Sequence, residues 1–215
     1  MTANDREQRK TFDNVPDIYH EIRPRYPPAL FDALFALLPA RPRVLEVGPG
    51  TGQATSDLLA RGATVHGVEI GVAMAAKLRA VLPTNELTIT IGDFELVPQE
   101  RAAYDCVTSA TAYHWIAPDA QRDRPAALLQ PGGIVAIIDL IHVASPDDHG
   151  FFAAAQPIYR RYDGDEETPQ LPQRGETDPP MRAALENDDR FRDVRVHRYD
   201  WNQAYTAAEY RKLLL

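Results

Sequence analysis

The stretch VLEVGPGTGQAT, residues 44–55, decides the fold of this chain. It begins as a short apolar run, which is typical of a strand buried on both faces of a parallel sheet. Three glycines spaced GxGxG follow, Gly48, Gly50 and Gly52, where the chain turns towards a helix. The first such turn of a doubly wound sheet is where nucleotide-like ligands approach the backbone. The spacing of these glycines is therefore the first evidence on the class of ligand.

The segments that follow alternate between strand and helix patterns. Strands linked through helices pair in parallel and carry helices on both faces. We therefore predict an α/β fold with a doubly wound, mostly parallel sheet in three layers, α/β/α. The expected strands span residues 43–48, 63–70, 86–93, 104–111 and 134–141, and the expected helices span 51–62, 71–83 and 119–133.

The start of the chain is polar and then becomes apolar. Residues 1–12 are predicted to be a disordered tail, whereas residues 13–40 are predicted to form helices that cap the domain. Because proline suits the first turn of a helix, the main cap helix is expected to begin at Pro27 or Pro28.

The alternation breaks after the fifth expected strand. Residues 142–190 include an acidic, proline-rich run, which predicts a variable lid or insertion, with a solvated connector as the alternative. A strand over 191–201 and a helix over 206–215 are then expected to complete a single domain, residues 13–215.

Composition limits the classes of function. The 215 residues carry a net charge of −8, which argues against nucleic acid or an anionic membrane as the main partner, since both attract clustered Lys and Arg. Cys106 is the single cysteine and is expected to be a core thiol, and no Cys/His pattern predicts a metal site. The charged start does not resemble a signal peptide, and no stretch approaches the roughly 18 apolar residues of a membrane span. We therefore expect a cytoplasmic protein.

Residues near the strand ends narrow the ligand class. The dinucleotide fingerprint GxGxxG needs its third glycine where this chain has Gln53, and Pro49 removes a backbone N–H that a phosphate would use. Glu69 ends the second expected strand, about twenty residues on, where a carboxylate accepts both ribose hydroxyls and repels a 2′-phosphate. Asp93 and Phe94 follow the third strand and suit the amine and the ring of adenine. The pattern favours an adenosine ligand without a pyrophosphate.

Five ordered motifs resemble those of the class I S-adenosylmethionine-dependent methyltransferases, in the type 11 domain group. They are VLEVGPGTG, VEI, GDFE, YDCVTSATAYHWI and LLQPGGIVAI. The resemblance implies a Rossmann-like fold and S-adenosyl-L-methionine as cofactor. It also implies the cofactor-binding residues, which are Glu46, Gly48, Gly50 and Gly52 at the methionine side of the glycine turn, Glu69 and Ile70 at the ribose, Asp93 and Phe94 at the adenine, and Ser109 and Ala110 at the methionine amino group.

Methyl transfer is an in-line displacement, so the site must align the reactants, exclude water and deprotonate an acceptor that carries a proton. Tyr113, His114 and Trp115 follow the fourth expected strand at the carboxyl edge of the sheet, where such folds place active sites. We interpret His114 as the candidate catalytic base, and Tyr113 and Trp115 as acceptor-binding residues. The alternative for all three is packing against the next helix.

Two further segments are candidates for covering the site. In proteins similar to this one, a leading helix covers the cofactor, which assigns Tyr19 and Arg23 to the cofactor and Tyr26 to the acceptor. Arg23 suits the methionine carboxylate or an acidic acceptor, and the alternative is a surface arginine stacked on tyrosines. Tyr159 lies where family members place acceptor-binding elements.

The resulting hypothesis is a methyltransferase that acts on a small-molecule acceptor. An NAD-dependent oxidoreductase is one alternative, against which Gln53 argues. A non-catalytic protein that binds S-adenosylmethionine is the other, because the final antiparallel strand of the family is apparently missing. A sheet edge left unpaired is an association hazard, so we expect a monomer or a homodimer.

Overall fold

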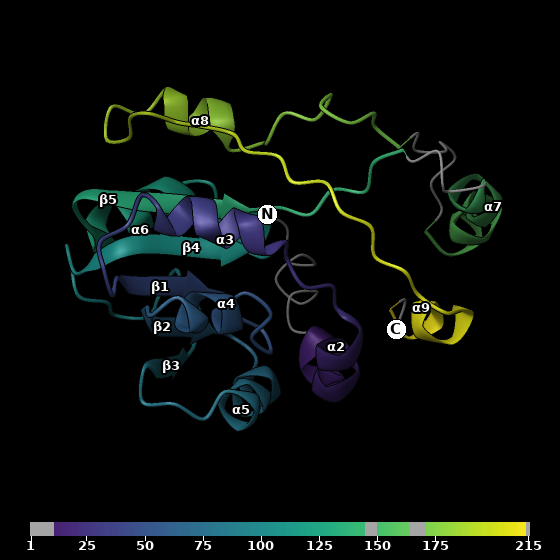
Figure 1. The fold of residues 1–215 in the computed structure, drawn as a ribbon, viewed down its shortest axis with the longest axis horizontal. Helices are drawn as coiled ribbons and strands as arrows, with labels where there is room; N and C mark the ends of the chain where they lie inside the picture. Colours follow the sequence, from purple (N-terminus) through teal and green to yellow (C-terminus); the bar gives the residue numbers. More distant parts are fainter. Residues whose placement is uncertain (1–10, 145–149, 164–170, 214–215) are drawn as a thin grey trace. The chain divides into compact units, whose positions relative to one another are not determined.

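One parallel sheet organises the protein, which we describe from a computed structural model covering residues 11–144, 150–163 and 171–213. Its strand order is β3-β2-β1-β4-β5, and every neighbouring pair is parallel (Figure 1). The predicted α/β fold with a doubly wound parallel sheet is confirmed. The strands are β1 (Arg43–Val47), β2 (Thr64–Glu69), β3 (Leu87–Ile91), β4 (Tyr104–Ala110) and β5 (Leu129–Ile138).

Helices cover the sheet because each parallel connection needs a crossover. The chain moves from β1 to β2 in one direction and from β4 to β5 in the other, so right-handed crossovers place α4 and α6 on opposite faces. Figure 1 shows α3 and α4 in front of the sheet. The elements of this part of the chain are η1 (Thr11–Asn14), α2 (Pro16–Ile22), α3 (Pro28–Phe35), α4 (Thr55–Ala60), α5 (Val72–Val81), η2 (Tyr113–Trp115) and α6 (Ala120–Leu128).

The main core lies between α3, α4 and the centre of the sheet. Val44 of β1, Val65 of β2 and Cys106 of β4 are in register and fully buried. Phe31 of α3 and Leu58 of α4 join the same cluster. Burying a side chain of the size of Leu or Phe stabilises the fold by about 1.5–3 kcal/mol. Cys106 is thus a core thiol as expected, and burial raises its pKa to about 12.

The glycine turn, residues 48–52, has a backbone conformation that residues with a side chain adopt only at an energetic cost. Gly48, Gly50 and Gly52 have φ values of 66°, 57° and 99°, which lie in the left-handed region that favours glycine. A Cβ on Gly52 would lie 2.6 Å from Cδ1 of Leu78 in α5, so the turn and α5 pack too closely for a side chain. This conformation also delays the first helix, which begins at Thr55 rather than at residue 51.

The helix and strand around residues 119–141 have other boundaries than predicted. α6 ends at Leu128, not at residue 133, and β5 begins at Leu129 and ends at Ile138. The reason is local, because the run Pro131-Gly132-Gly133 cannot extend a helix. The residues before Ile134 form an irregularity in the pairing with β4, and regular pairing starts at Ile134.

Beyond β5 the chain contributes to two compact units. The first comprises the described residues up to 139 together with those from 199 onwards, and the second comprises residues 140–198. The second contains α7 (Phe151–Asp163) and α8 (Arg182–Glu186), whereas α9 (Ala207–Leu213) belongs to the first. The lid or insertion over residues 142–190 falls within the second unit, and its role and the single-domain boundaries stay predictions.

Two predictions at the ends of the chain are corrected. Residues 191–201 form no strand, because a strand exists only through hydrogen bonds to a neighbour and no described strand offers them to this segment. At the other end, Thr11 already lies in η1, so the predicted tail cannot extend to residue 12, and residues 1–10 lie outside the described residues. The predicted C-terminal helix is present as α9.

Replacing Gly52 by alanine tests the close packing of the turn against α5. We expect Gly52→Ala to lower the free energy of unfolding by about 2–4 kcal/mol, the sum of left-handed strain and overpacking. Gly62→Ala is the matched control, because Gly62 has φ 87° and nothing within 4 Å of an added Cβ. Urea denaturation measures both, and equal losses in the two variants would contradict the packing role.

Candidate functional site

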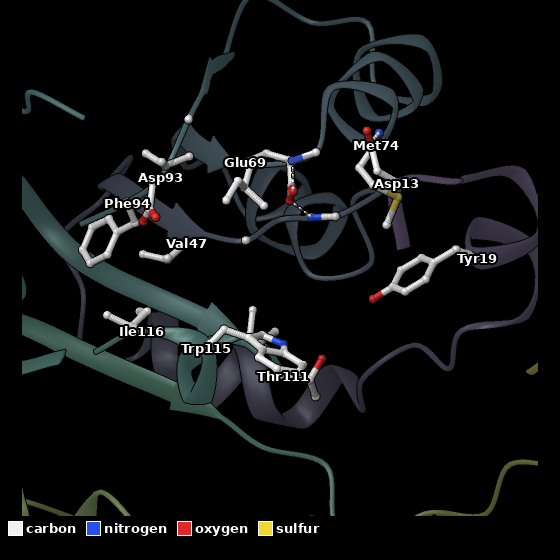
Figure 2. Close-up of a pocket in the computed structure, with 18 residues that line it drawn as sticks. Asp13, Tyr19, Val47, Glu69, Met74, Asp93, Phe94, Thr111, Trp115 and Ile116 are labelled. Atoms are coloured by element: carbon white, nitrogen blue, oxygen red, sulfur yellow. Dashed lines mark hydrogen bonds between the residues drawn. The ribbon is translucent and has the colours of Figure 1, made fainter. Parts of the chain in front are cut away.

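A cavity lies at the carboxyl edge of the sheet, beside the glycine turn. Figure 2 shows Phe94 towards one end and Tyr19 towards the other, with Glu69 on one wall and Trp115 facing it. Strand ends, the loops that follow them, and the N-terminal helices all contribute to the lining. The lining residues are Asp13, Tyr19, Val47, Gly48, Gly50, Val68, Glu69, Ile70, Gly71, Met74, Gly92, Asp93, Phe94, Ala110, Thr111, Ala112, Trp115 and Ile116.

Glu69 joins the first two strand-to-helix turns. Its Oε2 accepts a hydrogen bond of 2.9 Å from the N–H of Gly50, and its Oε1 accepts one of 2.8 Å from the N–H of Gly71 (Figure 2). Burial raises the pKa of Glu69, and the N–H groups of Gly71 and Gly50 oppose that shift by favouring the carboxylate. Each carboxylate oxygen keeps a further lone pair for hydroxyl groups in the cavity.

The end of the cavity near Phe94 combines an aromatic ring with a carboxylate. Phe94 is buried and lines the cavity together with Asp93 and Ile116. The guanidinium of Arg124 lies 5.1 Å from the centroid of the Phe94 ring, and it donates a 2.6 Å hydrogen bond to the carbonyl of Val97. These contacts hold a flat apolar surface beside an acceptor group, which is the surface that a purine ring fits.

The loop after β4 forms the wall opposite Glu69. Thr111 has φ 55°, an uncommon and strained conformation for a β-branched residue, and such strain concentrates at functional sites. The hydroxyl groups of Thr111 and Tyr26 are hydrogen-bonded at 3.1 Å. Trp115 lines the cavity, and its ring centroid lies 4.6 Å from that of His114.

Helix α2 brings Tyr19 to the cavity. Carbon Cε1 of Tyr19 would lie 3.6 Å from a Cβ on Gly50, so the ring covers the glycine turn. The guanidinium of Arg23 lies 4.8 Å from the centroid of the Tyr19 ring and does not line the cavity. The contact corresponds to the alternative interpretation of Arg23 as an arginine stacked on tyrosine. Upstream, Asp13 accepts a 2.9 Å hydrogen bond from the N–H of Met74.

The structure brings most of the predicted cofactor residues together. Gly48, Gly50, Glu69, Ile70, Asp93, Phe94, Ala110 and Tyr19 all line the cavity. Gly52 instead packs against α5, and the hydroxyl of Ser109 donates a 2.8 Å hydrogen bond to the carbonyl of Val47 inside the sheet. Glu46 is 1% exposed, lies behind the turn, and accepts a 2.7 Å hydrogen bond from the hydroxyl of Thr55.

The predicted acceptor residues are divided between the cavity, which Trp115 lines, and other parts of the protein. Tyr113 is 2% exposed and donates a hydrogen bond to the carbonyl of Gln121 in α6, which is the packing alternative. Tyr26 is buried against Phe31 with its hydroxyl on Thr111. His114 is exposed beside the cavity and outside its lining. Tyr159 lies in α7 of the second unit, and its side chain is outside what the structure describes.

Sequence reasoning missed several lining residues. Asp13 followed a stretch interpreted as a tail, and Met74 belonged to the apolar pattern of a helix. Thr111, Ala112 and Ile116 flank the aromatic motif after β4, and their proximity to it was the only signal. A positive φ at a threonine cannot be recognised from its residue type.

Other classes of site find no support among the described residues. In that part of the chain, no group of three or more His, Cys, Asp or Glu side chains could hold a metal ion. No helix within the described ranges is long and apolar enough to cross a membrane.

Comparison with known proteins shows similarity to methyltransferases. Residues 45–137 match the family model described as a methyltransferase domain. An uncharacterized methyltransferase of Mycobacterium tuberculosis (strain ATCC 25618 / H37Rv) is 35% identical over 139 residues, which cover 64% of this chain and 55% of the relative. An uncharacterized methyltransferase of Bacillus subtilis (strain 168) is 37% identical over 98 residues, covering 46% of this chain and 44% of the relative.

Solved structures support the same assignment. The CcbJ methyltransferase from Streptomyces caelestis aligns with a TM-score of 0.51 and 31% identity, covering 60% of this chain and 57% of that one. A putative type II methyltransferase from Anaeromyxobacter dehalogenans aligns with a TM-score of 0.51 and 30% identity, covering 66% and 57%. Residues 45–137 thus match a methyltransferase domain, and these similarities support the class I S-adenosylmethionine-dependent methyltransferase that the motifs predicted. It covers 55% of the length of the mycobacterial relative.

The buried Glu46 makes stability depend on pH. Burial raises the pKa of Glu46 to about 7. The hydrogen bond from Thr55 opposes part of this rise, because it favours the carboxylate. A raised pKa contributes stability that is complete below about pH 4.5 and is lost as the pH rises through 7. Glu46→Gln keeps an acceptor for Thr55 and cannot ionise. We expect its stability relative to the native chain to increase by about 3 kcal/mol between pH 4.5 and pH 8.

Urea denaturation across this pH range provides the measurement. Glu100→Gln is the control, because it removes the same charge from an exposed position. A difference between Glu46→Gln and the native chain that stays constant with pH would contradict the buried, protonated state.

Proposed function

We propose that this protein transfers a methyl group from S-adenosyl-L-methionine to a small-molecule acceptor. The observation that carries the proposal is the bridge formed by Glu69, which fixes a carboxylate at the cavity wall between the N–H groups of Gly50 and Gly71. A carboxylate held in this way suits the two ribose hydroxyls of an adenosine ligand. The matched methyltransferase domain supplies the class of reaction.

The shape and chemistry of the lining fit this cofactor. Phe94 and Ile116 offer apolar surface to the adenine, and Asp93 offers an acceptor for its amine. Gly48 and Gly50 leave the backbone open beside the ribose, since neither carries a side chain that would project there. The turn lacks the dinucleotide spacing, and Gln53 occupies the position of the third glycine.

The chain's own residues orient the reactants and exclude water. When bound, S-adenosyl-L-methionine would supply a methyl group that the acceptor attacks in line with the carbon–sulfur bond, and that bond would break to leave a neutral thioether. Tyr19 covers the glycine turn from α2, while Trp115 and Thr111 form the facing wall. An aromatic enclosure keeps water away from the sulfonium and aligns an incoming nucleophile. The net charge of −8 favours a small molecule over nucleic acid as the acceptor.

His114 is proposed as the base for an acceptor that carries a proton. Its ring contacts that of Trp115, which lines the cavity, at a centroid distance of 4.6 Å, and His114 itself lies outside the lining. Partial burial lowers the pKa of His114, and the negative charge of Asp139 opposes part of that shift. The imidazole is therefore neutral at pH 7 and able to accept a proton.

Glu69 is the direct test of the cofactor assignment. We expect Glu69→Gln to weaken S-adenosylhomocysteine binding by about tenfold or more, because charge-assisted hydrogen bonds to the ligand are lost. Isothermal titration calorimetry measures the dissociation constant, and circular dichroism checks that the fold is kept. A parallel titration with NADH tests the alternative that the protein is an NAD-dependent oxidoreductase. Tight NADH binding without S-adenosylhomocysteine binding would overturn the assignment.

The proposed base gives a pH dependence with a defined sign. Because the pKa of His114 lies below 6.5, activity should stay constant from pH 8 to 6.5 and fall at lower pH as the ring becomes protonated. His114→Gln should lower kcat by about a hundredfold and remove the acidic limb. A radiolabelled-methyl assay over a metabolite panel identifies the acceptor and provides the rates. An acidic limb that persists in the variant would rule out His114 as the base.

A further inference from the structure

Helix α2 covers the cavity but has little internal support. It has seven residues, lacks a side-chain cap at its N-terminus, and has one buried residue, Ile22. A helix of this length is not stable in isolation, because nucleation costs more than a few hydrogen bonds return. Its position over the cavity therefore depends on contacts with other parts of the chain.

Side-chain contacts attach α2 to α5 and to the glycine turn. The ammonium of Lys77 in α5 donates to the Asp17 carboxylate at 2.7 Å. His20 Nδ1 and the hydroxyl of Thr51 in the glycine turn are hydrogen-bonded at 3.1 Å. Both contacts involve side chains of α2, and neither reaches the carbonyl of Ile22 at its C-terminal end.

The C-terminal part of the chain supplies the contacts at that end. The hydroxyl of Tyr205 donates a 3.1 Å hydrogen bond to the carbonyl of Ile22, the last residue of α2. Lys212 of α9 pairs with Glu21 at 2.8 Å. These residues belong to the same compact unit as α2, although 183 residues separate Tyr205 from Ile22 in the sequence. We call residues 205–212 the C-terminal strap.

The bond from Tyr205 reaches the turn that carries Tyr19. The N–H of Arg23 donates a 3.1 Å hydrogen bond to the carbonyl of Tyr19, so Tyr19 and Ile22 share the last turn of the helix. The guanidinium of Arg23 also lies against the Tyr19 ring, and its positive charge opposes the rise that burial causes in the pKa of Tyr205. Arg23 thus acts on both tyrosines, through its contact with the Tyr19 ring and through its charge at Tyr205.

We propose that the C-terminal strap holds α2 closed over the cofactor cavity, with Tyr205 as a positioning residue that acts through Tyr19 on the retention of the adenosine ligand. Without the hydroxyl of Tyr205, the carbonyl of Ile22 loses its partner and the last turn of α2 opens more often. Each opening withdraws the Tyr19 ring from the glycine turn. The ligand part of this inference rests on the proposed function, whereas the strap itself does not.

Tyr205→Phe is the main test, because it removes the hydroxyl and keeps the ring. We expect hydrogen exchange of the amides of residues 19–23 to become about fivefold faster in the ligand-free protein, the effect of losing one hydrogen bond. We expect S-adenosylhomocysteine to dissociate about fivefold faster, with little change in its association rate. Tyr104→Phe is the matched control, because the hydroxyl of Tyr104 bonds to His66 and Gln99 at the start of β4.

A charge exchange tests the second contact of the strap. Lys212→Glu should accelerate exchange in α2 by about twofold, since exposed ion pairs contribute little, and adding Glu21→Lys should restore the native rate. Arg211→Glu is the control, because it makes the same change of charge at the neighbouring, exposed position of α9. Rescue by the reversed pair would not occur if Lys212 acted only through the stability of α9.

The possible outcomes separate the strap from the proposed function. Unchanged amide hydrogen exchange of residues 19–23 in Tyr205→Phe would contradict the proposal that the strap holds α2. Faster exchange with unchanged dissociation of S-adenosylhomocysteine would overturn the link to ligand retention. A native chain that binds no S-adenosylhomocysteine would contradict the proposed cofactor and the ligand part of the inference, and the exchange measurement would still decide whether the strap exists.

Discussion

The carboxylate of Glu69 is the interaction on which the site depends. It accepts hydrogen bonds from Gly50, in the turn after β1, and from Gly71, in the turn after β2, so a single side chain sets the spacing of two turns. Both N–H groups face a cavity wall and would be costly to bury without an acceptor. The same oxygens remain available to a ligand. The arrangement of the two turns and the proposed ligand binding therefore depend on the same carboxylate, and its removal would disturb both.

Several residues around the Glu69 carboxylate adopt conformations or positions that cost free energy. The glycine turn needs left-handed backbone at three positions, and Thr111 accepts the same conformation with a β-branched side chain. Glu46 is buried with one hydroxyl partner. The core between α3, α4 and the sheet offsets these terms through buried apolar area. Gly48, Gly50 and Thr111 lie at the carboxyl edge of the sheet, where the chain leaves regular strands and lines the cavity.

The sequence allowed much of the fold to be predicted, for physical reasons that individual residues illustrate. Val44 and Val65 lie in short apolar runs, which only a sheet covered on both faces can bury. The segment 191–201 has a similar local pattern and forms no strand, because strand formation requires a partner that local pattern does not reveal. The end of α6 at Leu128 was missed because the prediction gave too little weight to Pro131 and the glycines after it.

The sequence by itself determined the parallel α/β fold, the glycine turn and the presence of a carboxylate at the end of β2, because residue spacing along strands and turns expresses these directly. Tertiary structure alone decided which candidates meet. It directed Glu46 and Ser109 into the interior, paired Tyr26 with Thr111, and brought Tyr205 to the end of α2. The reason is that a side chain's function depends on neighbours distant in sequence, and only the folded chain brings them into contact.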